Sequence, residues 1–211
     1  MKYEKKPIYD SHSPHLTRPS RLLSLGMVHP IQPALLTTFE KPLRFAIKRH
    51  RATNLHTDYR LEVFDTLFSA VSWNHPSLDP RQPTQIREMP DHDPAYLLGE
   101  RRIPDGAYGA GPMVVWDYGT YAPLGAPEGS PSEAVLAGLL AGRLEFAFEG
   151  RRMRGAFRLE IADRGWRLAK MRDEDAAVRA EPWDDRSIVT GRSLDELERD
   201  YQAQMRRLRG R

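Results

Sequence analysis

Short strand-like segments separated by turns dominate this chain from Phe45 onward, and they restrict the fold more than any other feature. From Thr57 to Val63 apolar residues alternate with polar ones, the pattern of a strand that is buried on one face, whereas residues 45–47 are continuously apolar. Residues 152–161 alternate basic with apolar side chains, and Asp163-Arg164-Gly165 then supplies a hairpin turn. The glycine-rich residues 105–111 precede such a strand and not a helix, which predicts a tight turn instead of a phosphate loop. The predicted strands are 45–49, 57–64, 66–73, 113–118, 143–149, 153–162 and 165–171.

Many short strands are typical of a barrel or a sandwich. The 17 prolines and 15 glycines favour turns over long helices. Helical signals are confined to residues 133–141, preceded by Ser132 as an N-cap, and to a terminal segment that opens with the capping box Ser193-x-x-Glu196. We therefore predict an α+β fold that is mainly β, an antiparallel β-barrel with a few short flanking helices.

The length of 211 residues fits one domain. We divide the chain into a proline-rich N-terminal arm, in part disordered, at residues 1–42, a barrel domain at 43–192 and a C-terminal helix at 193–211. No apolar run approaches 18 residues and the N-terminus has no signal-peptide pattern, so we expect a cytoplasmic protein without a membrane partner. Because the chain has no cysteine, any metal site must consist of histidines and carboxylates.

The densest group of potentially catalytic side chains lies within residues 50–62. Alternate side chains of a strand share a face, which places His56, Asp58 and Arg60 together. An imidazole and a carboxylate two residues apart can both ligate one divalent ion, and His50 is a candidate third ligand. Arg60 lies about 7 Å beyond Asp58 along the strand, where a guanidinium can bind a phosphate oxygen held by the metal.

The same alternation also describes the solvent-exposed face of an ordinary strand, with Asp58 and Arg60 as a surface ion pair. Three features favour a functional site over this alternative. His50 precedes the pair, Arg60 is in phase with it, and Asp91-His92 with Tyr96 follows downstream. These residues suit one chemistry, that of a phosphate ester held by a metal ion and cationic side chains.

Several motifs follow one another along the chain in a regular order. They are residues 45–62, Pro76-Ser77-Leu78-Asp79-Pro80, Asp91-His92 with Tyr96, residues 103–111, and Val114-Val115-Trp116-Asp117. Each motif is weak alone, but in this order and spacing the series resembles the 3′-phosphoesterase module of bacterial DNA ligase D. The resemblance covers roughly residues 43–195. With no Lys-x-Asp-Gly adenylation motif in the chain, it implies a stand-alone module.

The resemblance implies a metal-dependent phosphoesterase that trims 3′-phosphate or 3′-ribonucleotide ends of DNA in end repair. Its partners would be DNA or RNA-tipped DNA ends, with a separate DNA ligase or end-joining proteins as further candidates. A divalent ion, manganese before others, would be bound by His50, His56 and Asp58. Catalytic roles would fall to His92, Arg60 and Tyr96, and substrate binding to Lys48, Arg60 and His92.

The chain departs from the family's usual pattern at two places. Trp73-Asn74-His75 stands where Pro-Lys-Gly is usual, and Pro83-Thr84 stands where Lys-Arg is usual. Two phosphate-binding cations are therefore expected to be missing, and Lys48, at a position where Gln is usual, is a candidate for partial compensation. On this basis we expect cleavage of a phosphodiester to survive better than cleavage of a dianionic terminal phosphate.

Two other functions are compatible with parts of the sequence. His56-x-Asp58 with His92 also matches the two-histidine, one-carboxylate set of a non-haem iron oxygenase. Alternatively, the basic strand at 152–161 binds a DNA backbone in a non-catalytic end-binding module. A net charge of +3 and an isoelectric point near 9.2 permit nucleic-acid contact without requiring it.

Overall fold

The computed structural model describes residues 41–125, 129–177 and 184–210, so the predicted arm lies outside it except for its last two residues. The strands are β1 (Leu43–Arg51), β2 (Leu55–Val63), β3 (Thr66–Ser72), β4 (Thr84–His92), β5 (Arg101–Ile103), β6 (Gly111–Pro123), β7 (Arg143–Gly150), β8 (Arg154–Ala162) and β9 (Gly165–Lys170). The helices are α1 (Pro131–Leu140), α2 (Leu194–Arg209) and a single 3-10 turn, η1 (Pro94–Tyr96).

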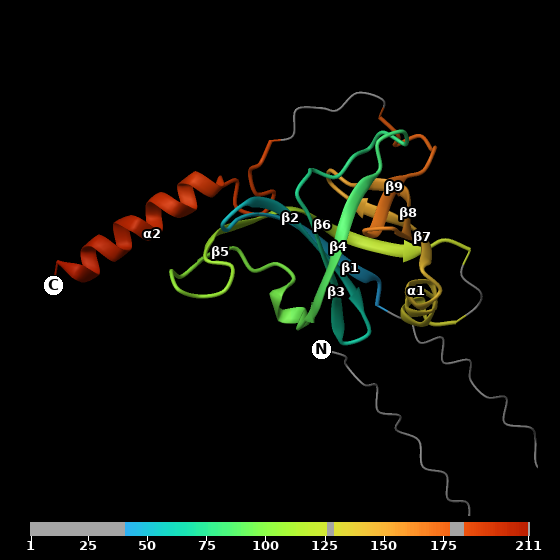
Figure 1. Ribbon diagram of the computed structural model, residues 1–211, viewed down its shortest axis with the longest axis horizontal. Helices are drawn as coiled ribbons and strands as arrows, with labels where there is room; N and C mark the ends of the chain where they lie inside the picture. Colours follow the sequence, from blue (N-terminus) through green and yellow to red (C-terminus); the bar gives the residue numbers. More distant parts are fainter. Residues whose placement is uncertain (1–40, 126–128, 178–183, 211) are drawn as a thin grey trace, which may run out of the picture. The chain divides into compact units, whose positions relative to one another are not determined.

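Eight of these strands form a closed antiparallel barrel in the order β1-β2-β3-β4-β9-β8-β7-β6, and β6 pairs with β1 to close it (Figure 1). The short β5 pairs with the first residues of β6 and stands outside the ring. Every pairing is antiparallel, as expected for strands joined by short turns. The predicted fold class, a mainly β antiparallel barrel with short flanking helices, is confirmed.

One face of each barrel strand carries the apolar residues that fill the interior. In β1 and β2 these include Phe45, Ile47, Tyr59 and Leu61, none more than 4% exposed. Phe45 contacts Phe148 of β7 with ring centroids 4.3 Å apart, so the core joins opposite walls of the barrel. Because side chains alternate along a strand, the polar residues between these positions point to the outer face of the same two strands.

Two strands, β4 and β5, were not predicted from the sequence. No strand signal is apparent in the sequence at residues 84–92 or 101–103, yet β4 continues to His92 before η1 begins. Only Thr84 and Ile86 of β4 are buried, so its apolar alternation is too short to identify it. The pairing of β3 with β4 also has an irregularity between Leu67 and Ser69, which accommodates a proline in β4.

The two helices differ in how they are attached. Ser132, expected as an N-cap, lies inside α1, where its hydroxyl accepts the Phe64 backbone N–H at 3.1 Å, and Ser130 is the N-cap. The capping box of Ser193 and Glu196 at the start of α2 is confirmed. Within the described residues no helix is both long and apolar enough to cross a bilayer.

Candidate active site

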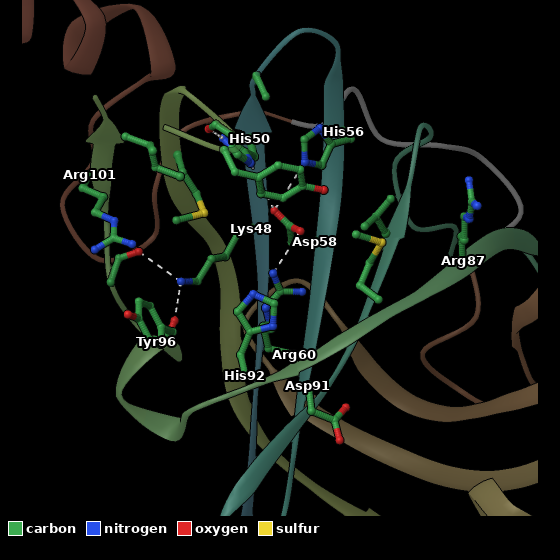
Figure 2. A pocket seen from close by; sticks show the side chains of 18 of the residues that line it. Lys48, His50, His56, Asp58, Arg60, Arg87, Asp91, His92, Tyr96 and Arg101 are labelled. Atoms are coloured by element: carbon green, nitrogen blue, oxygen red, sulfur yellow. Dashed lines mark hydrogen bonds and ion pairs between the residues drawn. The ribbon is translucent and has the colours of Figure 1, made fainter. Parts of the chain in front are cut away.

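All of the residues predicted to bind metal or substrate line one cleft on the outer face of β1 and β2, with a volume of about 1080 Å³ (Figure 2). The short β5, the η1 turn and the loop before β6 form one wall, and β3 and β4 form the other. The predicted residues on this cleft are Lys48, His50, His56, Asp58, Arg60, His92 and Tyr96.

His50, His56 and Asp58 form a compact group that we call the metal cluster. His50 and His56 face each other directly in the pairing of β1 with β2, with ring centroids 4.7 Å apart. The Oδ2 atom of Asp58 lies 3.6 Å from His50 Nδ1 and 3.6 Å from His56 Nε2. One potential ligand atom from each residue lies within 4.8 Å of the other two, close enough for a single ion to contact all three.

Hydrogen bonds to nearby backbone carbonyls fix which imidazole nitrogens of the metal cluster carry protons and which carry lone pairs. His50 Nε2 donates to the Gly109 carbonyl at 2.8 Å, and His56 Nδ1 donates to the Asn54 carbonyl at 2.9 Å. In a neutral imidazole the other nitrogen then carries a lone pair, which here faces Asp58. The buried Asp58 Oδ2 atom has no hydrogen-bond donor among the described residues. Three converging lone pairs without a donor suit a bound cation, so these residues fit a divalent metal ion.

Arg60 folds back onto the metal cluster. Its Nη2 atom donates to Asp58 Oδ1 at 3.1 Å and its Nη1 atom donates to the Tyr59 carbonyl at 3.0 Å. Burial would raise the pKa of Asp58, but the neighbouring His50 and the positive charge of Arg60 together hold this pKa below its ordinary value. The side chains of Asp58 and Arg60 are only 6% and 9% exposed, so the alternative of a surface ion pair on a solvent-exposed face is wrong.

Lys48 reaches across the floor of the cleft to its far wall. Its buried amino group donates to the carbonyls of Tyr96 at 2.6 Å and Gly99 at 3.0 Å (Figure 2). Burial, and next the positive charge of Arg60, lower the pKa of Lys48 to about 8. Lys48 therefore fastens the loop that carries Tyr96 to β1, and one N–H of its three is left for the cleft.

His92 lies at the end of β4 beside Arg60 (Figure 2). Its Nδ1 atom is 2.8 Å from the Pro90 carbonyl and 3.1 Å from the Ser69 hydroxyl, so this nitrogen carries a proton and Nε2 is left to interact with a substrate. Burial, followed by the charge of Arg60, lowers the pKa of His92. The Tyr96 ring meets the His92 ring edge to face, with centroids 6.3 Å apart.

Four further residues on the cleft have the chemistry of a nucleic-acid site and were not predicted as site residues. They are Trp73, Arg87, Arg101 and Tyr108. Arg87 and Arg101 belong to the two unpredicted strands; Arg101 stands next to Arg102 in a basic pair, and Arg87 has no signal beyond its proximity to the motif at residues 91–96.

The two positions at which cations were expected to be missing do not line the cleft. Thr84 is 4% exposed and pairs with Leu168 of β9. Its hydroxyl oxygen lies 3.5 Å from the His75 carbonyl oxygen. The carbonyl of Asn74 accepts the hydroxyl of Thr57, a buried residue on the inner face of β2. Arg87 and Arg101, in contrast, bring positive charge to the cleft. The expectation that cleavage of a phosphodiester survives better than cleavage of a terminal phosphate stays a prediction.

The basic strand of the sequence prediction lies away from this cleft. β8 is four places from β2 in the ring of eight strands, so the two are on opposite sides of the barrel. Its arginine Arg158 pairs with Glu145 at 3.0 Å, and Glu160 of the same strand pairs with Arg167. These pairs offset much of the positive charge that suggested a DNA backbone site on β8.

Comparison with known proteins identifies relatives of this chain. Residues 48–160 match the family model of the DNA ligase D 3′-phosphoesterase domain. The multifunctional non-homologous end joining protein LigD of Pseudomonas aeruginosa is 37% identical over 139 residues, which are 64% of this chain and 16% of that protein. The protein of the same name from Mycolicibacterium smegmatis is 31% identical over 144 residues, covering 64% of this chain and 18% of that protein.

A third relative is the multifunctional non-homologous end joining DNA repair protein LigD of Mycobacterium tuberculosis, 35% identical over 104 residues, or 47% of this chain and 13% of that protein. The matches thus span less than a fifth of the length of each relative. The family model, in contrast, covers more than half of this chain and includes every residue predicted for the site. The chain belongs to the DNA ligase D 3′-phosphoesterase domain family.

Proposed function

We propose that this chain is a metal-dependent 3′-phosphoesterase that removes a 3′-phosphate or a 3′-terminal ribonucleotide from DNA ends. The observation that carries the proposal is the metal cluster, in which two imidazole nitrogens face a buried carboxylate oxygen that accepts no hydrogen bond from the part of the chain that the structure describes. Family membership supports the reaction class. Because the relatives are named as non-homologous end joining proteins, we extend the proposal to end joining, with a DNA ligase or other end-joining proteins as partners.

We propose manganese as the ion, bound by His50, His56 and Asp58. A divalent ion there would supply Lewis-acid stabilisation of a phosphate oxygen. Arg60 uses one side of its guanidinium for Asp58 and offers its remaining N–H groups to the phosphate. Lys48 holds the loop of Tyr96 in place and adds one donor.

His92 acts on the leaving 3′-oxygen in this scheme. Its fixed Nδ1–H leaves Nε2 for the substrate, and the T-shaped contact with Tyr96 limits the movement of its ring. In the free cleft the lowered pKa favours the neutral imidazole. A bound phosphate adds negative charge next to Arg60, which favours the protonated form and makes His92 a proton donor when the ester bond breaks.

The two alternative functions have less support. The oxygenase alternative required His92 beside His56 and Asp58, whereas the grouping found in the described residues contains His50 in that place. Its substrate chemistry would also leave Arg60 without a role. The non-catalytic alternative depended on the basic strand β8, which lies on the side of the barrel opposite β2. There Arg158 pairs with Glu145 and Arg154 pairs with Asp175.

Turnover of defined DNA ends tests the proposed function. With manganese, the protein should release inorganic phosphate from a primer that ends in a 3′-phosphate and should shorten a primer that ends in a ribonucleotide. The two reactions are measured under single-turnover conditions on primers of identical sequence. Oxygen-dependent oxidation with ferrous iron is the control for the oxygenase alternative. Binding of both primers without cleavage of either, with all metals tested, would support the end-binding alternative instead.

Substrate binding should depend strongly on salt and little on sequence, because the cations of the cleft contact phosphates. Arg87→Ala and Arg101→Ala should each reduce the slope of log affinity against log salt by about 0.7, the value for one contact to a single strand. Arg158→Ala on β8 is the matched control and should leave the slope unchanged. Fluorescence anisotropy between low and moderate salt measures this. A slope that falls only in the Arg158 variant would place the DNA on the other side of the barrel.

A further inference from the structure

Besides Tyr96, which contacts His92, two large aromatic side chains on the cleft are exposed. Tyr108 is 92% exposed and Trp73 is 57% exposed, and both line the cleft. The other two described tryptophans, Trp116 and Trp166, are at most 6% exposed, as expected for rings that stabilise a core. An aromatic face left in water beside a binding site is suited to stack on another flat group.

The residues that carry these two rings adjoin strands on opposite sides of the metal cluster. The cluster occupies the paired strands β1 and β2. Trp73 directly follows β3, the neighbour of β2, at a level where Ser72 pairs with Thr57 beside His56. Tyr108 precedes β6, the neighbour of β1 on the other side. The backbone of β3 and that of β6 are each one strand spacing, roughly 5 Å, from the strands that carry the cluster.

The turn that carries Tyr108 is fixed to the metal cluster. The next residue, Gly109, accepts the hydrogen bond from His50 Nε2 at 2.8 Å and has a positive φ of 72°. A Cβ atom at Gly109 would approach His50 Cε1 to 3.3 Å, and one at Gly111 would meet the Arg51 carbonyl at 1.9 Å. These close approaches require glycine, and they hold the turn at a set distance from His50.

Basic side chains accompany the two rings. Figure 2 shows Arg101 on one side of the metal cluster and Arg87 on the other. Both arginines line the cleft and both are exposed. Aromatic faces that alternate with cations along a groove match an unpaired nucleic-acid strand, whose bases stack on the rings while its phosphates contact the cations. In a base-paired end the bases are stacked on one another inside the duplex, so their faces are not available to two separate rings.

We propose that Trp73 and Tyr108 are base-stacking surfaces that hold the last two nucleotides of an unpaired 3′ end, one on each side of the metal cluster. This inference rests on the proposed function and deepens it, since it makes a frayed or single-stranded DNA end the substrate class. On an end with a terminal ribonucleotide, the last two bases leave the duplex, lie on the two rings, and place the phosphodiester between them, the bond to be cleaved, at the metal cluster.

Equilibrium binding to ends that contain no scissile bond tests the proposal independently of catalysis. The probe is a labelled duplex with a two-nucleotide 3′ overhang and a 3′-hydroxyl end, compared with the same duplex in which both overhang residues are abasic. Tyr108→Leu and Trp73→Leu should each weaken binding of the first probe by about 5- to 150-fold, the effect of losing one stacked base. Each should change binding of the abasic probe by less than about twofold.

Matched variants separate stacking from other effects. Tyr108→Phe keeps the ring and should bind both probes like the wild type. Phe64→Leu, which alters a ring of similar exposure, 52%, at the other end of β2, should also have no effect. Equal losses on the base-containing and abasic probes, or no loss on either, would overturn the proposal. Because the probes carry no scissile bond, a protein that cannot cleave any 3′ end still gives a clear answer.

Discussion

Removal of divalent metal should abolish turnover of a 3′-phosphate primer, and added manganese should restore it. His50→Ala, His56→Ala and Asp58→Asn should each lower the rate at least about a hundredfold, since that is the loss found when one group that stabilises developing charge is removed. The physical reason is the convergence of two imidazole lone pairs and one buried carboxylate oxygen on a single point. Single-turnover cleavage in chelator and after addition of manganese checks this result.

Metal binding should also be measurable without turnover. Manganese at one hundred times its Kd should raise the free energy of unfolding by about 2.7 kcal/mol. For a domain of this size that is a rise of about 5–10 °C in Tm. The three ligand variants should fold and yet show no such rise, whereas His75→Ala, an imidazole outside the cleft that contacts Asp185, should keep both the rise and the turnover. Full wild-type turnover in excess chelator would contradict the metal site.

The alternation of residues in β2 was enough to predict most of the metal cluster. A period of two places His56, Asp58 and Arg60 on one face of any strand. The connection between β1 and β2 is short, residues 52–54, so the two strands pair as a hairpin and His50 falls opposite His56. Local sequence therefore contains the information for these contacts, and the prediction and the structure agree on them.

Contacts between distant segments could not be predicted in the same way. Lys48 binds the carbonyls of residues 96 and 99, and no local pattern identifies which backbone atoms a lysine will reach. Thr84 was interpreted as a vacant cation position because its environment depends on pairing with β9, more than 80 residues later in the chain. The position of the basic strand β8 across the barrel from the cleft likewise follows from the closure of the sheet, which no single strand determines.

Replacement of His92 should slow the chemical step more than it weakens substrate binding. Nδ1 of His92 is held by the Pro90 carbonyl and the Ser69 hydroxyl, so Nε2 is available to the leaving 3′-oxygen. Negative charge builds up on this oxygen as its bond to phosphorus breaks, and proton donation by a positioned imidazole contributes about 10²- to 10⁴-fold. We expect His92→Ala to lower kcat by that factor and to change KM by less than about tenfold, as steady-state and single-turnover kinetics can measure.

A change of leaving group distinguishes proton donation by His92 from a structural effect. In a primer in which sulfur replaces the scissile 3′-oxygen, the leaving group is a thiolate, which is far less basic than an alkoxide because a thiol has a pKa of about 8.5. The loss caused by His92→Ala should therefore shrink to less than about tenfold on this substrate. His75→Ala should be neutral on both substrates. If His92→Ala reduced cleavage of both equally, His92 would act by positioning Arg60 or the loop of Tyr96, and the role of proton donor would be wrong.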